Sequence, residues 1–218
     1  MSLKKNLDVL VFDRMRDRII NGDWLPGQNL DIDELAEYYE VSRTPIIQAL
    51  KQMQTQEMVI VSRNGKYSIP CIDKKHVRDI CTIRLLLERQ AITEIEDKKI
   101  VIDADLLHTI GQKCYRANMV GDVTESRRED LTWHKTLVKE AGNDCLNGIY
   151  EKVQGQFMVA NFLQIFHTKE QQLVASDEHL KIVEALKNQS YDLVLSLLDE
   201  HINLACEKIL HRMDLSQL

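Results

Sequence analysis

The sequence lacks an excess of positive charge and any long apolar run, and each absence excludes a class of protein. Its 218 residues carry a formal net charge of −6, with a pI near 5.7, which does not suit a protein that coats nucleic acid. Any contact with DNA must therefore be local and geometric. No window holds about 18 consecutive apolar residues and no signal-peptide core is present, so we expect a cytoplasmic protein without a membrane span.

The cysteines are few and far apart. They lack any C-x-x-C pair and are odd in number, which disfavours both a disulfide framework and a zinc ribbon. Isolated cysteines of this kind usually behave as small apolar residues, so the pattern predicts buried free thiols. The set is Cys71, Cys81, Cys114, Cys145 and Cys206.

The stretch from Leu35 to Leu50 indicates two short helices joined by a tight turn. Val41 is placed to fill the turn, and Pro45 is tolerated in the first turn of the second helix. Ser42 or Thr44 is expected to cap that helix. This arrangement is typical of a DNA-reading unit.

The second of these helices is expected to run from about residue 42 to 56 and to present Arg43 and Gln48. When such a helix enters the major groove, the residues near its N-terminus meet base edges or phosphates. Arg43 lies at that end, so it is the first candidate for a DNA contact.

Further elements surround this unit. Apolar residues in 7–21 recur close to a 3.6-residue period and predict a helix, and a capping box at the start of 31–39 predicts another. The β-prone runs 59–61 and 67–69 flank an Asn-Gly pair at 64–65, a strong hairpin signal. Three helices followed by a hairpin predict a winged helix.

Two basic residues flank the tip of this hairpin. Arg63 and Lys66 lie on either side of the Asn-Gly turn, where we expect them to contact DNA phosphates. The alternative is that they only keep an exposed hairpin soluble. The neighbouring helices favour the DNA contact.

The second part of the chain has no convincing strand. Its apolar residues recur at helical spacing, and Gly- and Asn-containing breaks separate the segments. The segments are 74–97, 104–119, 124–141, 144–166, 177–188 and 191–213. We therefore predict a mainly α fold, with a winged helix-turn-helix domain in 1–72, a linker and helix start in 73–80, and an all-helical bundle in 81–218.

One acid and three histidines fall on inward-facing stripes of these helices. Asp130 and His134 are four residues apart on one stripe, and His179 and His201 each share a stripe with apolar residues. Burying them is costly unless they share a partner, and a divalent metal is the simplest one. The alternative is that each histidine bonds separately to a backbone carbonyl or a nearby acid.

A set of three imidazoles and one carboxylate suits Zn²⁺, Ni²⁺, Mn²⁺ or Fe²⁺, and affinity order alone does not choose among them. Such a site leaves positions open for water or a small carboxylate. Arg84 lies on a neighbouring amphipathic helix, where it is placed either to bind that anion or to form a surface ion pair with Glu88.

Several segments resemble a known family. The run I-I-N-G-D-W-L-P-G-Q-N-L, followed by D-E-L-A and V-S-R-T-P-I-I-Q-A-L, resembles the GntR family of bacterial transcription regulators. The second half resembles the FCD ligand-binding domain of the FadR-type branch, through R-L-L-L-E, D-L-T-W-H, A-G-N, D-E-H-L and D-E-H-I. The resemblance covers nearly the whole chain.

This resemblance implies roles for individual residues. The residues that match the metal ligands of metal-binding FCD domains are Asp130, His134, His179 and His201. Arg84 matches an arginine that contacts carboxylate effectors. The residues that match DNA-contacting or DNA-facing positions are Arg43, Ser42, Thr44 and the wing-tip glycine Gly65.

The chain also departs from the family pattern. Ile47 stands where the recognition helix usually has a second arginine, and Gln48 stands at the following acidic position. An arginine contact to guanine is worth roughly 1–3 kcal/mol of discrimination, so we expect a changed operator or weaker binding. Trp133 replaces the usual Phe beside the metal histidine, which alters the volume of the pocket.

The function implied is that of a homodimeric transcription regulator that binds double-stranded operator DNA and responds to a small organic acid. One alternative is a regulator whose metal is structural or is itself the signal. A metalloenzyme is the remote alternative, since no spare acid is evident beside the ligands to act as a general base and a DNA-reading domain would then be idle.

Overall fold

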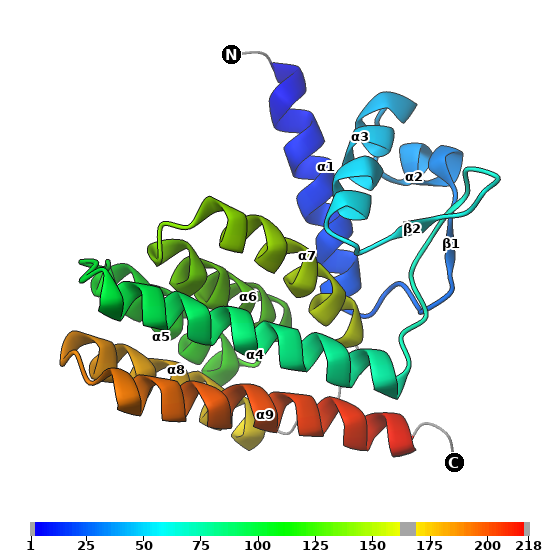
Figure 1. Ribbon diagram of the computed structural model, residues 1–218. Helices are drawn as coiled ribbons and strands as arrows, with labels where there is room; N and C mark the ends of the chain where they lie inside the picture. Colours follow the sequence, from blue (N-terminus) through cyan, green and yellow to red (C-terminus); the bar gives the residue numbers. More distant parts are fainter. Residues whose placement is uncertain (1–2, 162–168, 216–218) are drawn as a thin grey trace.

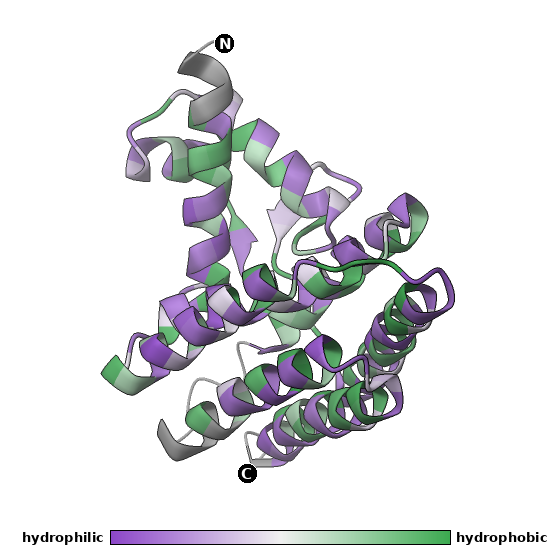
Figure 2. Ribbon diagram, turned by 90° about the vertical axis from the view of Figure 1, so that its left-hand side faces the viewer, coloured by the Kyte–Doolittle hydropathy of each residue, from purple (hydrophilic) through white to green (hydrophobic). Residues whose placement is uncertain are grey.

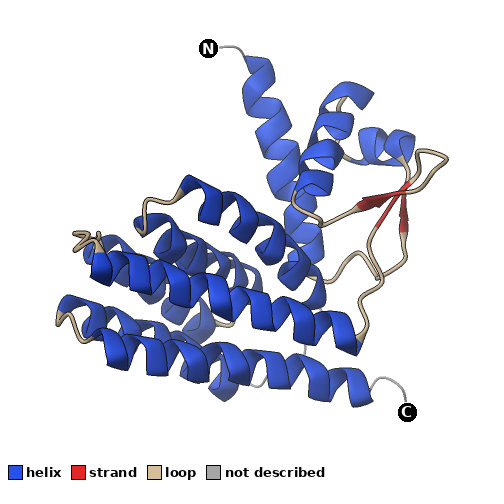
Figure 3. Cartoon of the chain, in the orientation of Figure 1, coloured by secondary structure: helices blue, strands red, loops and turns tan. Residues whose placement is uncertain are grey.

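The computed structural model describes residues 3–161 and 169–215, and within these ranges the chain is mainly helical (Figure 1). A smaller N-terminal unit lies against a bundle of long helices. The three short strands found in the described residues all lie in the N-terminal unit (Figure 3). The predicted fold class, a winged helix-turn-helix followed by an all-helical bundle, is confirmed.

The N-terminal unit contains three helices and a small antiparallel sheet. The helices are α1 (Leu3–Ile20), α2 (Ile32–Tyr38) and α3 (Arg43–Thr55). The strands are β1 (Asn29–Leu30), β2 (Ile60–Val61) and β3 (Tyr67–Ser68), in the order β1-β3-β2. The predicted hairpin is β2–β3, and Gly65 takes a φ of 75° at its turn, a conformation that favours glycine. Strand β1 was not predicted.

The two helix caps of the helix-turn-helix differ. Asp31 caps α2 as predicted, because its Oδ1 accepts hydrogen bonds from the backbone amides of Asp33 at 2.8 Å and Glu34 at 3.1 Å. Ser42 occupies the N-cap position of α3, but its side chain makes no capping hydrogen bond. Thr44 already lies inside the first turn, so the expected side-chain cap of α3 is wrong.

Within the described part of the chain, six helices form the bundle, and their apolar faces pack inward. They are α4 (Lys74–Asp97), α5 (Ala104–Val120), α6 (Val123–Glu140), α7 (Asp144–Asn161), α8 (Lys169–Lys187) and α9 (Tyr191–Leu215). Asp73, Asp103 and Asp122 cap α4, α5 and α6. In Figure 2 the bundle helices carry hydrophilic and hydrophobic residues along their whole length, which is typical of amphipathic helices. Helix α8 begins eight residues earlier than predicted, at Lys169.

The bundle core surrounds the histidine-bearing helices. Helices α4 and α9 lie side by side and run in opposite directions (Figure 1). Trp133 and Leu137 of α6, Ile92 of α4 and Ile182 of α8 are fully buried in one apolar cluster. Polar groups placed in this cluster need partners, because water does not reach them.

The N-terminal unit rests directly on α6 and α7 of the bundle. Leu131 and Met158 are buried in the same apolar cluster as the core of the N-terminal unit. Gly155 lies so close to this unit that a Cβ there would be 1.8 Å from the carbonyl oxygen of Gln56. Only a glycine permits this approach, so α7 packs directly against the C-terminal end of α3. None of the helices in 3–161 and 169–215 is long and apolar enough to span a membrane.

The cysteines correct a prediction. Cys81 of α4 and Cys206 of α9 form a disulfide, with their Cα atoms 6.2 Å apart. Cys114 is a buried free thiol as expected, whereas Cys71 and Cys145 are exposed. Spacing along the chain failed to reveal the pair because the two cysteines are 125 residues apart in sequence and meet only through the packing of their helices.

Reduction of this disulfide is expected to lower the free energy of unfolding by about 2–5 kcal/mol, because the crosslink closes a long loop in the unfolded chain. Urea denaturation of the wild type with and without dithiothreitol measures the difference. Cys81→Ser is the control, since its stability must not respond to the reductant. Equal stability of oxidised and reduced wild type would contradict the crosslink.

Candidate metal and effector site

Three helices bring the predicted histidines to one point in the bundle. His134 comes from α6, His179 from α8 and His201 from α9, and all three side chains are buried. Asp130 lies one turn before His134, with its side chain 25% exposed. One ligand atom from each of these four residues falls within 4.8 Å of the others.

The three imidazoles face one another through the same nitrogen. The Nε2 atom of His134 lies 3.2 Å from that of His179 and 3.1 Å from that of His201, and the last two are 3.1 Å apart. Asp130 Oδ1 lies 3.4 Å from His179 Nε2 and 3.9 Å from His134 Nε2. The four groups therefore surround one small space.

Carboxylates fix which nitrogen of two histidines carries the proton. His134 Nδ1 donates to Glu88 Oε2 and His201 Nδ1 donates to Glu178 Oε2, each at 2.7 Å. A carboxylate only accepts hydrogen bonds, so Nδ1 of each ring holds the proton and a neutral ring has a lone pair on Nε2. Burial lowers the pKa of His134, which favours its neutral form.

The consequence is a contact that is not a hydrogen bond. The Nε2 atoms of His134 and His201 are 3.1 Å apart, and each directs a lone pair toward the shared space. Burial lowers the pKa of His179 well below its usual value, and the nearby His201 and His134 lower it further. Two neutral rings with facing lone pairs repel, and either a cation in the shared space or a proton on Nε2 of His179 would remove the repulsion.

The spacing fits a metal ion. Metal–nitrogen bonds of about 2.1 Å, at angles between octahedral and tetrahedral, place the nitrogens about 3.0–3.4 Å apart. The observed separations of 3.1–3.2 Å lie inside this range. Trp133 stacks on the ring of His179 with 4.3 Å between centroids and holds its orientation. The residues present therefore fit a divalent cation.

Glu88 links this cluster to Arg84. Its Oε1 accepts from Arg84 Nε and from Tyr150 Oη, each at 2.8 Å, while its Oε2 accepts from His134. Burial alone would raise the pKa of Glu88, but its contacts with His134 and Arg84 lower it to about 2. Glu88 is therefore a fully bonded carboxylate that positions both the histidine and the arginine.

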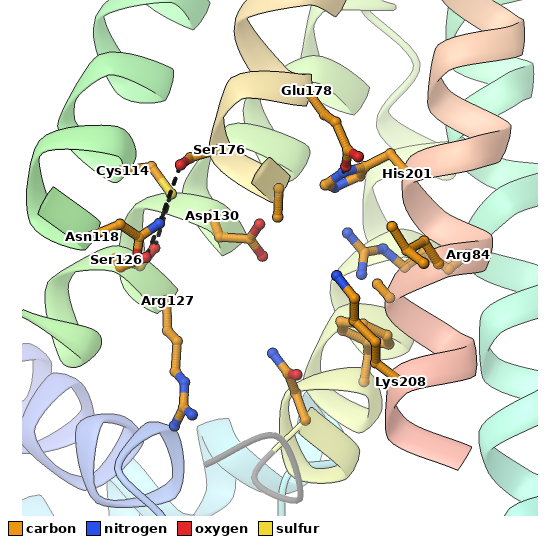
Figure 4. Close-up of a pocket in the computed structure, with 15 residues that line it drawn as sticks. Arg84, Cys114, Asn118, Ser126, Arg127, Asp130, Ser176, Glu178, His201 and Lys208 are labelled. Carbon is orange, nitrogen blue, oxygen red and sulfur yellow. Dashed lines mark hydrogen bonds and ion pairs between the residues drawn. The ribbon is translucent and has the colours of Figure 1, made fainter. Parts of the chain in front are cut away.

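Arg84 forms the ion pair that one of the two alternatives expected, with one correction. It does pair with Glu88, but the pair is buried rather than on the surface, with side chains 3% and 0% exposed. Its guanidinium lies 4.1 Å from the centre of the Phe157 ring and points into the cavity (Figure 4). The ion pair with Glu88 thus aims Arg84 at the space beside the cluster.

Sequence patterns missed the carboxylates that support the histidines. Glu88 was weighed only as a surface partner of Arg84, although its i+4 spacing places it on the same inward face. Glu178 gave no usable signal, because it precedes His179 and bonds instead to His201 on another helix. Two acids therefore lie beside the ligands, but each is bonded to a histidine and neither is spare.

A cavity of about 90 Å³ adjoins the cluster. Asp130 and His201 open onto it, and Arg84, Arg127 and Lys208 surround it with positive charge (Figure 4). Its remaining polar lining includes Asn118, Ser126, Ser176 and Glu178. A space of this size and charge suits a small anion.

The predicted DNA-contacting residues are exposed. They are Ser42, Arg43, Thr44 and Gln48 on or beside α3, and Arg63, Gly65 and Lys66 at the wing. Arg43, Gly65 and Lys66 line one hollow, so the start of α3 and the wing tip lie close together. Arg43 Nε lies 3.2 Å from Asp33 Oδ1, but both side chains are mostly exposed and the pair is weak.

Comparison with known proteins supports both parts of this description. Residues 8–66 match the family of bacterial regulatory proteins named gntR, and residues 79–204 match the FCD domain. The chain is similar to the HTH-type transcriptional regulator YdhC of Bacillus subtilis, with 24% identity over 204 residues that cover 93% of this chain and 91% of that protein. It is also similar to the gluconate operon transcriptional repressor of the same species, with 23% identity over 214 residues that cover 94% of this chain and 86% of that protein.

A solved structure has the same fold. E. coli McbR/YncC superposes with a TM-score of 0.79 at 18% identity, covering 93% of this chain and 96% of that one. The matches span the winged helix and the bundle together, and the matched families regulate transcription rather than catalyse reactions. The chain therefore belongs to the GntR family of bacterial transcription regulators and carries a C-terminal FCD domain.

Proposed function

We propose that this regulator holds a divalent metal at Asp130, His134, His179 and His201 and changes its affinity for operator DNA when a small carboxylate binds beside that metal. The observation that carries the proposal is the convergence of three Nε2 atoms at 3.1–3.2 Å, two of them on rings whose proton is fixed on the other nitrogen. Zn²⁺, Ni²⁺, Mn²⁺ and Fe²⁺ all suit this donor set.

The bound metal would supply positive charge and open coordination positions to the cavity. The chain provides the rest of the anion site. Arg84 has its Nε committed to Glu88, which leaves the outer nitrogens of its guanidinium directed at the cavity. Two parallel hydrogen bonds from a guanidinium to a carboxylate are strong and orient the ligand.

Operator recognition is assigned to α3 and the wing. Arg43, Ser42, Thr44 and Gln48 would face the major groove, and Arg63, Gly65 and Lys66 would follow the phosphate backbone. The net charge of −6 supports a small number of well-placed contacts rather than a broad basic surface.

The working form is proposed to be a cytoplasmic homodimer, because two winged helices read two half-sites about one helical turn apart. Residues 1–72 would form the DNA-reading part, and 81–218 the part that senses the acid and dimerises. Acid binding would favour one arrangement of the two winged helices in the dimer. It would thereby change the fraction of dimers whose winged helices are spaced to fit the operator.

Thermal denaturation tests the sensing role. Adding Zn²⁺, Ni²⁺, Mn²⁺ or Fe²⁺ to chelator-treated protein is expected to raise the melting temperature, and a panel of small carboxylates is expected to raise it further only when metal is present. A metal-dependent rise with no response to any carboxylate would instead support a metal that is structural or is itself the signal.

A further inference from the structure

One cation of the cavity forms no ion pair with an acid among the described residues and also reaches the N-terminal unit. Arg127 lies on α6, three residues before Asp130, and lines the cavity. Its Nη1 donates to the backbone carbonyl of Ile20 at 2.6 Å, and its Nη2 is buried without a hydrogen-bond partner among the described residues. Figure 4 shows the side chain running from the cavity edge toward α1.

This state of Arg127 is costly without a ligand. Burial lowers the pKa of Arg127, and the charge of Asp130 only partly opposes that effect. A buried donor of a charged group loses its hydration and regains it only through a bond to an acceptor. Its neighbour Arg128 differs, because it pairs with Asp17 at 2.9 Å and does not line the cavity.

We propose that Arg127 is a second anion anchor of the cavity, so that the effector is a compact acid with anionic groups at two ends, and that Arg127 passes the presence of this acid to α1. The inference rests on the proposed function and adds the class of effector and the route of regulation. The metal and Arg84 would hold one end of the acid and Arg127 the other.

The size of the cavity limits the acid. A volume of about 90 Å³ corresponds to roughly six to nine water-sized groups, at about 10–15 Å³ for each. Malonate and succinate fall within this range. Lys208 also lines the cavity and adds a positive charge to its wall.

The route to the DNA-reading unit is short. Ile20 is the last residue of α1, and its carbonyl is one of those a helix end leaves without an intrahelical partner. Arg127 donates a hydrogen bond to this carbonyl. The same end of α1 is also held by the hydrogen bond from the Thr124 hydroxyl to the Asn21 side chain at 2.5 Å. An acid that draws Arg127 into the cavity weakens the first contact and leaves the second, so the end of α1 shifts against α6.

Calorimetric titration of the full-length, metal-loaded protein with acetate, malonate and succinate tests this assignment. Wild type is expected to bind malonate or succinate at least about tenfold more tightly than acetate. Arg127→Gln should lose this preference while retaining its affinity for acetate. Arg128→Gln is the matched control, because Arg128 is a neighbouring arginine that also contacts α1. This variant should keep the preference for malonate or succinate over acetate.

Hydrogen exchange gives a readout that a merely structural role would not move. Malonate is expected to change the exchange rates of the amides of residues 21–23 in wild type and not in Arg127→Gln. If Arg127→Gln does not fold, Arg127→Lys, which retains a cation, should show a weakened preference for malonate over acetate.

The possible results separate the two proposals. Binding of acetate and malonate with equal affinity, or an unchanged preference in both Arg127 variants, would overturn the second anchor while leaving the metal and Arg84 site intact. Failure of the metal-loaded wild type to bind any of the three acids would overturn the proposed function itself and the second anchor with it.

Discussion

Replacing His134 by alanine is expected to weaken metal binding by at least about a hundredfold. The change removes one of three Nε2 donors, and losing even an outer carboxylate partner of a metal-bound histidine typically costs 10–100-fold in affinity. It also leaves Glu88 buried without one of its three hydrogen-bond donors, so the melting temperature should fall. Competition with a chromophoric chelator measures the affinity, and elemental analysis measures the stoichiometry.

Two further variants serve as comparisons for His134→Ala. His211→Ala removes an exposed histidine of α9 outside the cluster and should bind metal as wild type does. Glu88→Gln keeps the ligands but replaces the carboxylate that orients His134, so its affinity should lie between those of wild type and His134→Ala. An unchanged metal stoichiometry in His134→Ala would show that these residues do not form the site.

Replacing Arg43 by alanine is expected to abolish specific operator binding while leaving the oligomeric state unchanged. Arg43 is the first residue of α3, is exposed, and shares a hollow with the wing tip. One arginine contact to a base supplies roughly 1–3 kcal/mol, and a dimer loses it in both half-sites. Ile47 provides no second arginine to compensate. Fluorescence anisotropy with an operator fragment selected from genomic DNA measures the loss.

Lys51→Ala is the control for this variant. Lys51 is an exposed cation on the same helix but lies two turns further along, outside the hollow that contains Arg43. Its loss should weaken binding to all DNA sequences modestly and keep the preference for the operator. If Arg43→Ala still bound the operator in preference to competitor DNA of the same length, another residue would read the bases.

The fold was predictable because local signals agree along this chain. The capping carboxylate of Asp31, the Asn-Gly turn at 64–65 and the 3.6-residue apolar stripes each specify one element without reference to the others. Strand β1 escaped prediction because it is only two residues long, and its identity depends on pairing with β3. Such short strands carry no alternation to detect.

The site was predictable only in part. A helical stripe shows that His134, His179 and His201 face inward, but not that they face one another. Their meeting depends on how α6, α8 and α9 cross, which no single segment encodes. The pairing of Cys81 with Cys206 and the bond from His201 to Glu178 are likewise properties of the packed helices.

Operator affinity, measured with and without malonate in metal-loaded and metal-stripped protein, tests the central claim most directly. The account predicts that malonate changes the dissociation constant by at least about fivefold when metal is bound and has no effect on the stripped protein. An operator affinity that ignores malonate in the metal-loaded protein, or an equal response in the stripped protein, would contradict a metal-dependent acid sensor.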